Sequence, residues 1–322
     1  MMIFTLRLPS LPRFIGGVCF LILSFIWVAF TPAHADWKSA SALSAAVPKA
    51  SAAEMEGRLY VMSGSLGTGL RRFFELYDIE RDGWRPLTPL PTALRRFSLS
   101  AGAGRVFVMG GQDSETGAMS SKLWMYAPES AVWFELANMP LARLGHASFV
   151  EQNLIYVLGG FGAEAERVQS YNLDTGKWQS FAAKIPAIVS DAAVARMGQD
   201  YVLAGGTTET GADSVVVQAF SPATKSWRRL PDLPEASSGG ALGVVKGHLH
   251  YVGGFSTQRN QVLATHYRLK DGQWQNLATM PQGRHQMAYY GTGDALIVIG
   301  GALGRGFYSL FTASDGVSIY RP

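Results

Sequence analysis

Short apolar runs recur along the chain at a nearly constant interval, and each is stopped by a pair of small residues. The runs read LYVMSG, VFVMGG, IYVLGG, YVLAGG, LHYVGG and LIVIGG, and they end at Gly64, Gly111, Gly160, Gly206, Gly254 and Gly301. Successive ends are 47, 49, 46, 48 and 47 residues apart. Runs that are rich in β-branched and aromatic residues and end in glycine are typical of buried strands. The pattern therefore predicts six copies of one β-rich unit.

A second pattern with the same period follows the glycine pairs. An aromatic residue and a tryptophan flank a polar turn, as in LYDIERDGW and SYNLDTGKW, and the tryptophans are Trp84, Trp133, Trp178, Trp227 and Trp274. A proline comes seven residues later at Pro91, Pro140, Pro234 and Pro281, and one residue later than that at Pro186. This pattern predicts an outer hairpin in each unit, with the tryptophan filling the gap between neighbouring units.

Together these features resemble the kelch repeat, an apolar strand ending in Gly-Gly followed by an aromatic residue and a tryptophan. The resemblance covers residues 37–322. It implies an all-β fold in which each unit is a blade of four antiparallel strands, and six blades form a six-bladed propeller at residues 36–322. One such sheet buries both of its faces only when it packs between neighbours around an axis.

The ends of the chain offer two ways to complete the sixth blade. Trp37 precedes Gly64 by 27 residues, the interval that separates Trp84 from Gly111. We therefore expect the N-terminal segment DWKSASAL to supply the outer strand of the last blade, which joins the termini and removes the open edges. In the alternative, YSLFTASDGVSIYRP is itself the outer hairpin and Trp37 is surplus.

The first 35 residues predict a signal peptide. They contain Arg7 and Arg13, an apolar run from Phe14 to Phe30, and the sequence AHA before Asp36. We expect cleavage after Ala35 and export to the periplasm or the medium. Only this segment is then expected to contact the membrane. The alternative is an uncleaved membrane anchor, because the run approaches the length that spans a bilayer.

Charge and cysteine content exclude two classes of function. Removing residues 1–35 lowers the formal net charge from +4 to +2, which gives no reason to expect nucleic acid as a partner. The single cysteine, Cys19, lies in the predicted signal segment. Kelch propellers include copper galactose oxidases, which need a tyrosine cross-linked to cysteine, so that activity is excluded for the mature chain. We expect no cofactor, no metal and a monomer.

Arginines mark a candidate binding face. The connections that lead into the first strand of each blade share one face with the longer, more varied loops between its second and third strands, and such loops usually carry function. Arg143 and Arg284 stand three residues after a blade proline. The second blade offers Arg95 and Arg96 near this place, and Arg95 is one position off. In related propellers, arginines here project into a bowl that binds acidic ligands, which suits their charge-assisted bonds to carboxylates. The alternative is that each arginine braces a neighbouring blade through backbone carbonyls.

Other side chains could contribute to the same face. His146 and His285 adjoin the two arginines, and we take His146 as a ligand-binding candidate and His285 and Glu209 as weak catalytic candidates. His248 and His250 share a strand face but do not make a metal site. Further loop candidates are Gln112, Asp113, Glu164, Asp213, Phe255, Arg259, Arg305 and Tyr308.

Two functions remain. We favour a scaffold that binds a small acidic or carbohydrate ligand, or a protein partner, through this face. The alternative is a sugar mutarotase, because GRHQMAYYGTGDALIVIGG is similar to the last blade of the periplasmic kelch proteins that interconvert sialic-acid anomers, the N-acetylneuraminate epimerase branch. That activity needs a general acid or base and a cation for the carboxylate. Two departures weigh against it: Ala302 replaces a glutamate, and Glu209 has no arginine nearby.

Overall fold

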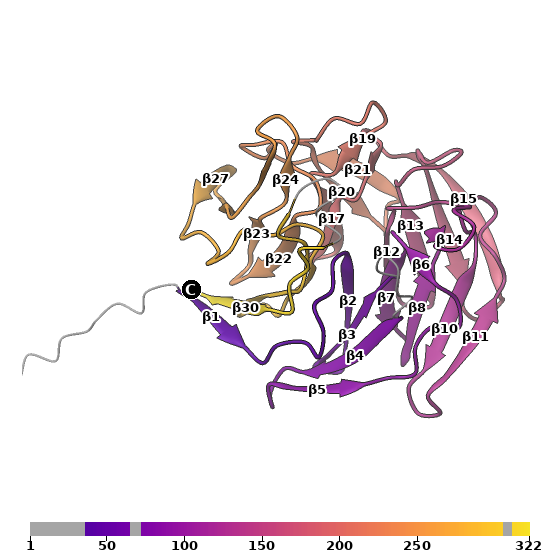
Figure 1. Ribbon diagram of the computed structural model, residues 1–322. Helices are drawn as coiled ribbons and strands as arrows, with labels where there is room; N and C mark the ends of the chain where they lie inside the picture. The colour runs from indigo at the N-terminus through magenta and orange to yellow at the C-terminus, as the bar shows by residue number, and fades with distance from the viewer. Residues whose placement is uncertain (1–35, 65–71, 305–310) are drawn as a thin grey trace, which may run out of the picture. The chain divides into compact units, whose positions relative to one another are not determined.

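The computed structural model describes residues 36–64, 72–304 and 311–322, all of which lie in one compact unit, Ala35–Pro322. In these segments the strands form six four-stranded antiparallel sheets and three two-stranded ribbons, and none of the described residues is helical. The sheets are arranged as blades around a common axis (Figure 1). The prediction of an all-β, six-bladed propeller is confirmed.

Each blade runs from an inner strand at the axis to an outer strand at the rim. The blades are β2 (Ala50–Met55), β3 (Arg58–Ser63), β4 (Phe73–Asp78), β5 (Gly83–Pro86); β7 (Ser98–Gly102), β8 (Arg105–Met109), β10 (Leu123–Ala127), β11 (Val132–Leu136); β12 (Ala147–Glu151), β13 (Leu154–Leu158), β14 (Arg167–Asn172), β15 (Lys177–Lys184); β17 (Ala193–Met197), β18 (Asp200–Ala204), β20 (Val217–Ser221), β21 (Ser226–Arg229); β22 (Ala241–Val245), β23 (His248–Val252), β26 (His266–Lys270), β27 (Gln273–Asn276); and β28 (Ala288–Gly291), β29 (Leu296–Ile299), β30 (Val317–Arg321), β1 (Asp36–Ala40).

The two-stranded ribbons are formed by the loops that connect the strands of the blades. They pair β6 (Leu94–Arg95) with β9 (Gln112–Asp113), β16 (Val189–Ser190) with β19 (Thr207–Thr208), and β24 (Phe255–Ser256) with β25 (Gln261–Val262). In the first two, the residues just before the inner strand pair with those just after the glycine pair. This pairing fixes the loops that surround the end of the axial channel.

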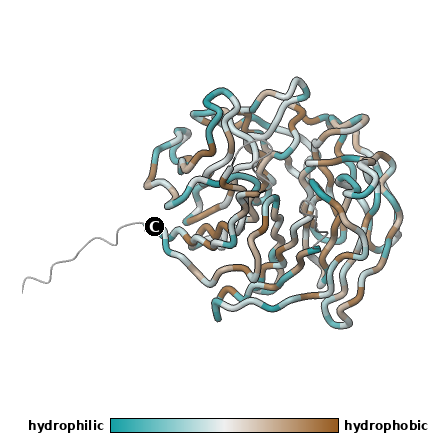
Figure 2. Tube along the Cα trace, in the orientation of Figure 1, coloured by the Kyte–Doolittle hydropathy of each residue, from teal (hydrophilic) through white to brown (hydrophobic). Residues whose placement is uncertain are grey.

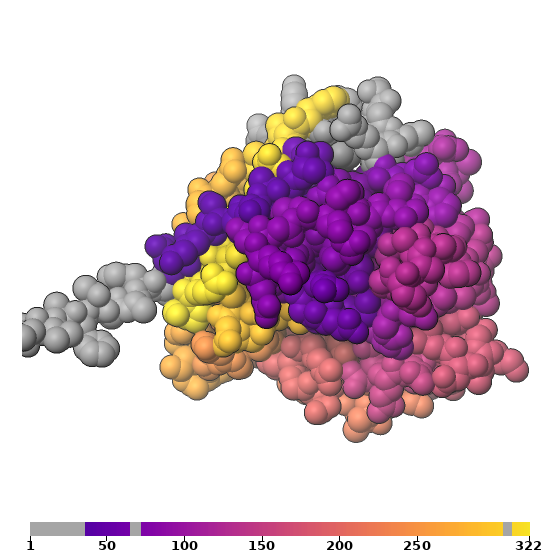
Figure 3. Space-filling view, turned by 90° about the horizontal axis from the view of Figure 1, so that it is seen from below, coloured from indigo at the N-terminus to yellow at the C-terminus, as the bar shows by residue number. Residues whose placement is uncertain are grey.

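The N-terminal strand closes the ring. β1 pairs antiparallel with β30, with Trp37 opposite Tyr320, so the sixth sheet has the order β1-β30-β29-β28. The two strands lie side by side at the surface, indigo against yellow (Figure 3). Trp37 is 9% exposed, and its Nε1 donates to Ala278 O at 3.1 Å. Closure by the N-terminus is therefore confirmed, and the alternative that leaves Trp37 surplus is wrong.

The repeat tryptophans connect neighbouring blades, as the sequence predicted. Four indole Nε1 groups donate to backbone carbonyls of the preceding blade or the loop leaving it, at 2.8–2.9 Å: Trp84 to Ser41, Trp133 to Thr88, Trp178 to Ala137 and Trp274 to Pro231. Apolar residues concentrate along the strands and hydrophilic ones in the loops (Figure 2). The repeated pattern thus encodes both the blade and its contact with the next one.

The predicted signal segment, residues 1–35, lies outside the described residues. Within the part of the chain that the structure describes, no helix has the length and hydropathy needed to cross a membrane.

Candidate functional site

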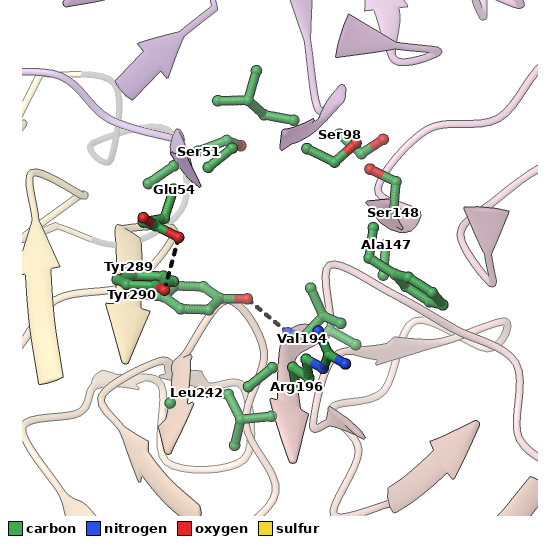
Figure 4. Close-up of a pocket in the computed structure, with 18 of the residues that line it drawn as sticks. Ser51, Glu54, Ser98, Ala147, Ser148, Val194, Arg196, Leu242, Tyr289 and Tyr290 are labelled. Atoms are coloured by element: carbon green, nitrogen blue, oxygen red, sulfur yellow. Dashed lines mark hydrogen bonds between the residues drawn. The ribbon is translucent and has the colours of Figure 1, made fainter. Parts of the chain in front are cut away.

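The inner strands of the blades surround a central cavity of about 580 Å³. Its walls come from β2, β7, β12, β17, β22 and β28, and it extends from the residues that open these strands to the turns that follow them. Figure 4 shows side chains from several blades converging on it. A cavity of this size is within the range that holds a small molecule, about 300–1,000 Å³.

Residues with left-handed backbone form a ring at one mouth of the cavity, on the face predicted to carry function. The ring has one member per blade, with φ between 53° and 64°: Lys49, Arg96, Gly145, Asp191, Gly239 and Gln286. Backbone amides donate around it at 2.6–3.2 Å, from Gly145 to Arg96, Asp191 to Gly145, Gly239 to Asp191, Gln286 to Gly239 and Ala50 to Gln286. Non-glycine residues seldom adopt this conformation. These hydrogen bonds hold it in place and fix where the ring side chains begin.

Charged side chains of the ring meet over the third blade. Arg96 Nη2 lies 2.5 Å from Asp191 Oδ2, and Arg96 Nε donates to Asp191 Oδ1 at 3.3 Å. Between them in the ring stands Gly145, where a Cβ would lie 2.9 Å from Asp191 Oδ1. Lys49 interacts electrostatically with both partners, and burial lowers the pKa of its ammonium below the ordinary value, opposed by Asp191 and reinforced by Arg96 and Arg95.

Buried hydroxyl groups line the wall below this mouth. Ser98 Oγ lies 2.7 Å from His146 Nε2. Ser100 and Ser148 are 5% and 6% exposed, and among the described residues their Oγ atoms have no hydrogen-bond partner. Gln286 Oε1 and His146 Nδ1 are also buried and have no hydrogen-bond partner among the described residues. Buried polar atoms normally find partners, so these atoms are candidates to bind a ligand.

A tyrosine side chain reaches from one inner strand of the channel to another. Tyr289 on β28 accepts a 2.7 Å hydrogen bond at its hydroxyl from the Val194 amide on β17 (Figure 4). The bond satisfies an inner-edge amide that has no neighbouring strand. Burial raises the pKa of Tyr289 to about 12, so the phenol is neutral.

The far end of the channel is also polar. Tyr290 donates to Glu54 Oε2 at 3.0 Å, and Tyr201 donates to Glu151 Oε2 at 2.8 Å. Arg196 Nη2 lies 3.5 Å from Glu151 Oε1. The carboxylates at this end are therefore engaged by the protein itself.

The two arginines that fit the sequence pattern best lie outside the cavity wall. Arg143 is 0% exposed, and its Nη atoms donate to the carbonyls of Gly159, Glu164, Ala165 and Arg167 at 2.8–3.3 Å. Arg284 donates to Gly300 O, Gly316 O and Ser318 Oγ at 2.6–3.3 Å. Burial lowers the pKa of each to about 10, so both remain charged at neutral pH. Their contacts are those of the bracing alternative, except that each braces its own blade.

The remaining candidates are scattered. Arg95 is exposed, and its Nε donates to Gln112 Oε1 at 2.9 Å. His285 is buried with Nε2 2.9 Å from Gly304 O, and Glu209 lies exposed on a loop; neither lines the cavity. Of the histidines, His146 does line it, but burial and the Arg143 charge lower its pKa to about 3, so the ring is neutral.

Some of the loop and metal candidates have partners of their own. Asp213 binds the Thr257 amide, and Arg259 pairs with Glu235 at 2.9 Å. Arg305 and Tyr308 lie outside the described residues. Within segments 36–64, 72–304 and 311–322, no three His, Cys, Asp or Glu side chains gather as a metal site.

Sequence reasoning missed Lys49, Asp191 and Gln286, and it chose Arg95 in place of the adjacent Arg96. A signal for them exists, because every ring residue lies fifteen positions before the last glycine of its strand run, from Lys49 and Gly64 to Gln286 and Gly301. Counting back from the glycines, instead of forward from the prolines, finds the ring. The residue type at this position varies between blades and is glycine in two of them, so the position is hard to recognise as part of the repeat.

Comparison with known proteins identifies the repeat independently. The family model described as the KLHDC2/KLHL20/DRC7 Kelch-repeats domain matches residues 96–301. Kelch-like protein 40 of Xenopus laevis is 29% identical over 260 residues, covering 77% of this chain and 42% of that protein. Kelch-like protein 25 of Homo sapiens is 28% identical over 230 residues, covering 68% and 38%. The chain thus spans about two fifths of the length of the curated relatives it matches.

A solved structure confirms the architecture. The structure titled "Structure of YjhT" matches with a TM-score of 0.75 and 18% sequence identity, covering 87% of this chain and 96% of that chain. At this identity the match shows the fold and not a shared activity.

Proposed function

The chain belongs to the kelch-repeat family, and from this premise we propose that it is an exported binding scaffold that holds a small, hydroxylated monoanion in its central cavity. Kelch propellers provide a rigid scaffold, and their function depends on the site that a particular chain builds on it. Export is proposed from the basic, apolar and AHA features of residues 1–35. The ligand class is proposed from the mouth and the wall of the cavity.

The charge of the mouth favours an anion. Lys49 and Arg96 contribute two cations, and Asp191 contributes one carboxylate that Arg96 already binds. A concave site with an excess positive charge raises the local concentration of anions and strengthens charge-assisted hydrogen bonds. One remaining cation matches a ligand with one carboxylate.

The unpartnered hydroxyl groups of Ser100 and Ser148 are the observation that carries the proposal. Both are buried in the wall and have no hydrogen-bond partner within the described segments. Leaving such a group unsatisfied costs about 1–3 kcal/mol. A ligand with hydroxyl groups, such as an acidic monosaccharide, satisfies them, whereas an aliphatic acid does not.

Titration calorimetry with matched ligands tests this proposal. We expect a hexuronate to bind the purified protein more tightly than the corresponding neutral hexose or an alkyl carboxylate. Lys49→Met should weaken hexuronate binding about tenfold, which corresponds to about 1.4 kcal/mol. Ser100→Ala with Ser148→Ala should weaken it without abolishing the preference for the anion.

The control is Lys177→Met, which removes an exposed lysine on the outer strand β15 and leaves the mouth unchanged. If no hexuronate binds, or if Lys49→Met and Lys177→Met have equal effects, the cavity is not the site. In that case the loop face remains as a surface for a protein partner.

A second candidate is interconversion of sugar anomers, which the sequence of the last blade suggests. The observation that favours it is the presence of a carboxylate, Asp191, and an amine, Lys49, at the same mouth, because ring opening needs a proton acceptor and a donor. Exchange spectroscopy on acidic sugars tests it. Exchange that the protein accelerates and Asp191→Asn abolishes supports catalysis, while binding without exchange leaves the scaffold function alone.

A further inference from the structure

Lys49 occupies an unusual position for a lysine. It is the residue before β2, has a left-handed backbone with φ 55°, and lines the mouth of the cavity. Among the described residues no carboxylate lies within ion-pair distance of its ammonium, and no acceptor forms a hydrogen bond with it. Its partly buried ammonium group therefore faces the cavity without a fixed partner.

The nearest acidic group does not pair with Lys49 because Arg96 holds it. Two guanidinium nitrogens of Arg96 contact both carboxylate oxygens of Asp191, at 2.5 Å and 3.3 Å. The ammonium of Lys49 is thereby left beside a second cation, in a site that also removes water from it. Burial and neighbouring positive charge both lower the pKa of Lys49, while Asp191 opposes the change. Enzymes use these same two influences to keep a lysine amine uncharged and nucleophilic.

Other lysines in the described segments lack this combination. Lys122 pairs with Glu135, Lys184 with Glu166 and Lys246 with Asp294, and all three are exposed at the surface. Lys177 is exposed on an outer strand. These residues provide internal references, because they share the chemistry of Lys49 without its surroundings.

We propose that Lys49 captures small 2-oxo acids covalently as an imine at the mouth of the cavity. The amine lone pair attacks the carbonyl carbon and forms the C–N bond. Both amine hydrogens then leave with the carbonyl oxygen as one water molecule, so that a C=N bond remains and no oxidant or reductant is consumed. The imine nitrogen then takes up one proton, so that the iminium keeps the positive charge of Lys49 at the mouth beside the carboxylate of the oxo acid. This inference rests on the proposed function, because both use the same charged mouth.

Borohydride trapping tests the proposal directly. The purified protein is incubated with pyruvate or glyoxylate at neutral pH, reduced with borohydride, and mapped by mass spectrometry. We expect one dominant reduced adduct, on the peptide that contains Lys49, in excess over the adduct on Lys177, because burial and the nearby arginines favour the uncharged amine of Lys49. The adduct on Lys49 should also form at a lower pH than an ordinary lysine pKa would allow.

Lys49→Arg separates covalent capture from charge recognition. This variant keeps a cation at the mouth but cannot form the imine, so the dominant adduct should disappear. Calorimetric binding of lactate, which has no ketone or aldehyde carbonyl to attack, should weaken less than it does in Lys49→Met. Equal adduct yields on Lys49 and the surface lysines overturn the inference, as does the absence of adduct from wild type. If lactate and hexuronate still bind in that case, the proposed binding function stands; if neither binds, it fails as well.

Discussion

The guanidinium of Arg96 reaches over Gly145 to the carboxylate of Asp191, with Nη2 2.5 Å from Oδ2. The two residues hold equivalent positions in the second and fourth blades, and the ring position between them is a glycine. The ion pair therefore links two blades that are not neighbours. It also orients both side chains at the mouth and leaves Lys49 unpaired, so the absence of a side chain at residue 145 shapes the whole site.

Gly145→Ala should destabilise the protein more than the left-handed backbone alone accounts for. An added Cβ would lie 2.9 Å from Asp191 Oδ1 and 3.1 Å from Arg96 Nη2, and φ at this glycine is +63°. We expect the free energy of unfolding to fall by about 2 kcal/mol or more, of which roughly 1 kcal/mol is the backbone penalty. Urea unfolding measures the loss.

The matched control for this substitution is Gly104→Ala. Gly104 has φ +71°, and nothing lies within 4 Å of its added Cβ, so it reports the backbone penalty alone. Equal losses at the two positions would show that the ion pair does not occupy the space above Gly145.

Truncation of the buried Arg143 and of the exposed Arg95 should change the free energy of unfolding by very different amounts. Arg143→Met removes the donor to the carbonyls of Gly159, Glu164, Ala165 and Arg167, and buried unsatisfied acceptors cost about 1–3 kcal/mol each without strict additivity. We expect a loss of at least about 3 kcal/mol in the free energy of unfolding. Arg95→Met, at an exposed site, should change it by no more than about 0.5 kcal/mol. Similar losses would contradict the structural role of Arg143.

The fold could be predicted from the sequence because the repeat encodes local and inter-blade contacts together. The interval from Trp37 to Gly64 equals that from Trp84 to Gly111, and this equality favoured a place for β1 in the sixth blade, where the structure has it. What the intervals could not decide was whether the C-terminal segment formed one strand or two. That choice depends on pairing between the two ends of the chain.

The site could be predicted only in part. The sequence pointed to the face of the propeller on which the ring of left-handed residues lies, and to His146, which lines the cavity. It emphasised Arg143 over Arg96 because a repeat position shows which residue opens a strand but not which way its side chain points. The left-handed backbone of Arg96, Lys49 and Asp191 is not encoded by glycine, so no residue type marks it. The direction of these side chains emerges only when six blades form hydrogen bonds around the axis.

A buried histidine pair in the fifth blade packs against Trp37 of the closing strand β1, and its protonation should weaken the fold. His250 Nδ1 lies 2.8 Å from His266 Nε2, and the ring of Trp37 packs 5.5 Å from that of His266. Burial, reinforced by His266 and nearby basic residues, lowers the pKa of His250 to about 3. Burial also lowers the pKa of His266 to about 4, opposed by Ala278 O. Both imidazoles are thus neutral in the folded protein at pH 5, whereas the unfolded chain, with a histidine pKa of 6.5, binds protons on both.

Because the folded-state pKa values are depressed, the stabilisation is complete above pH 6.5 and is lost as the pH falls toward about 4. Two additional protons on the unfolded chain give a slope of up to about 2.7 kcal/mol per pH unit. The test compares urea unfolding of wild type and of His250→Phe with His266→Phe between pH 4 and 7. In the variant, the slope of the unfolding free energy against pH should be smaller by the contribution of about two protons. His146 and the carboxylates contribute equally to both proteins. Parallel curves of unfolding free energy against pH would mean that the pair already binds these protons in the folded protein.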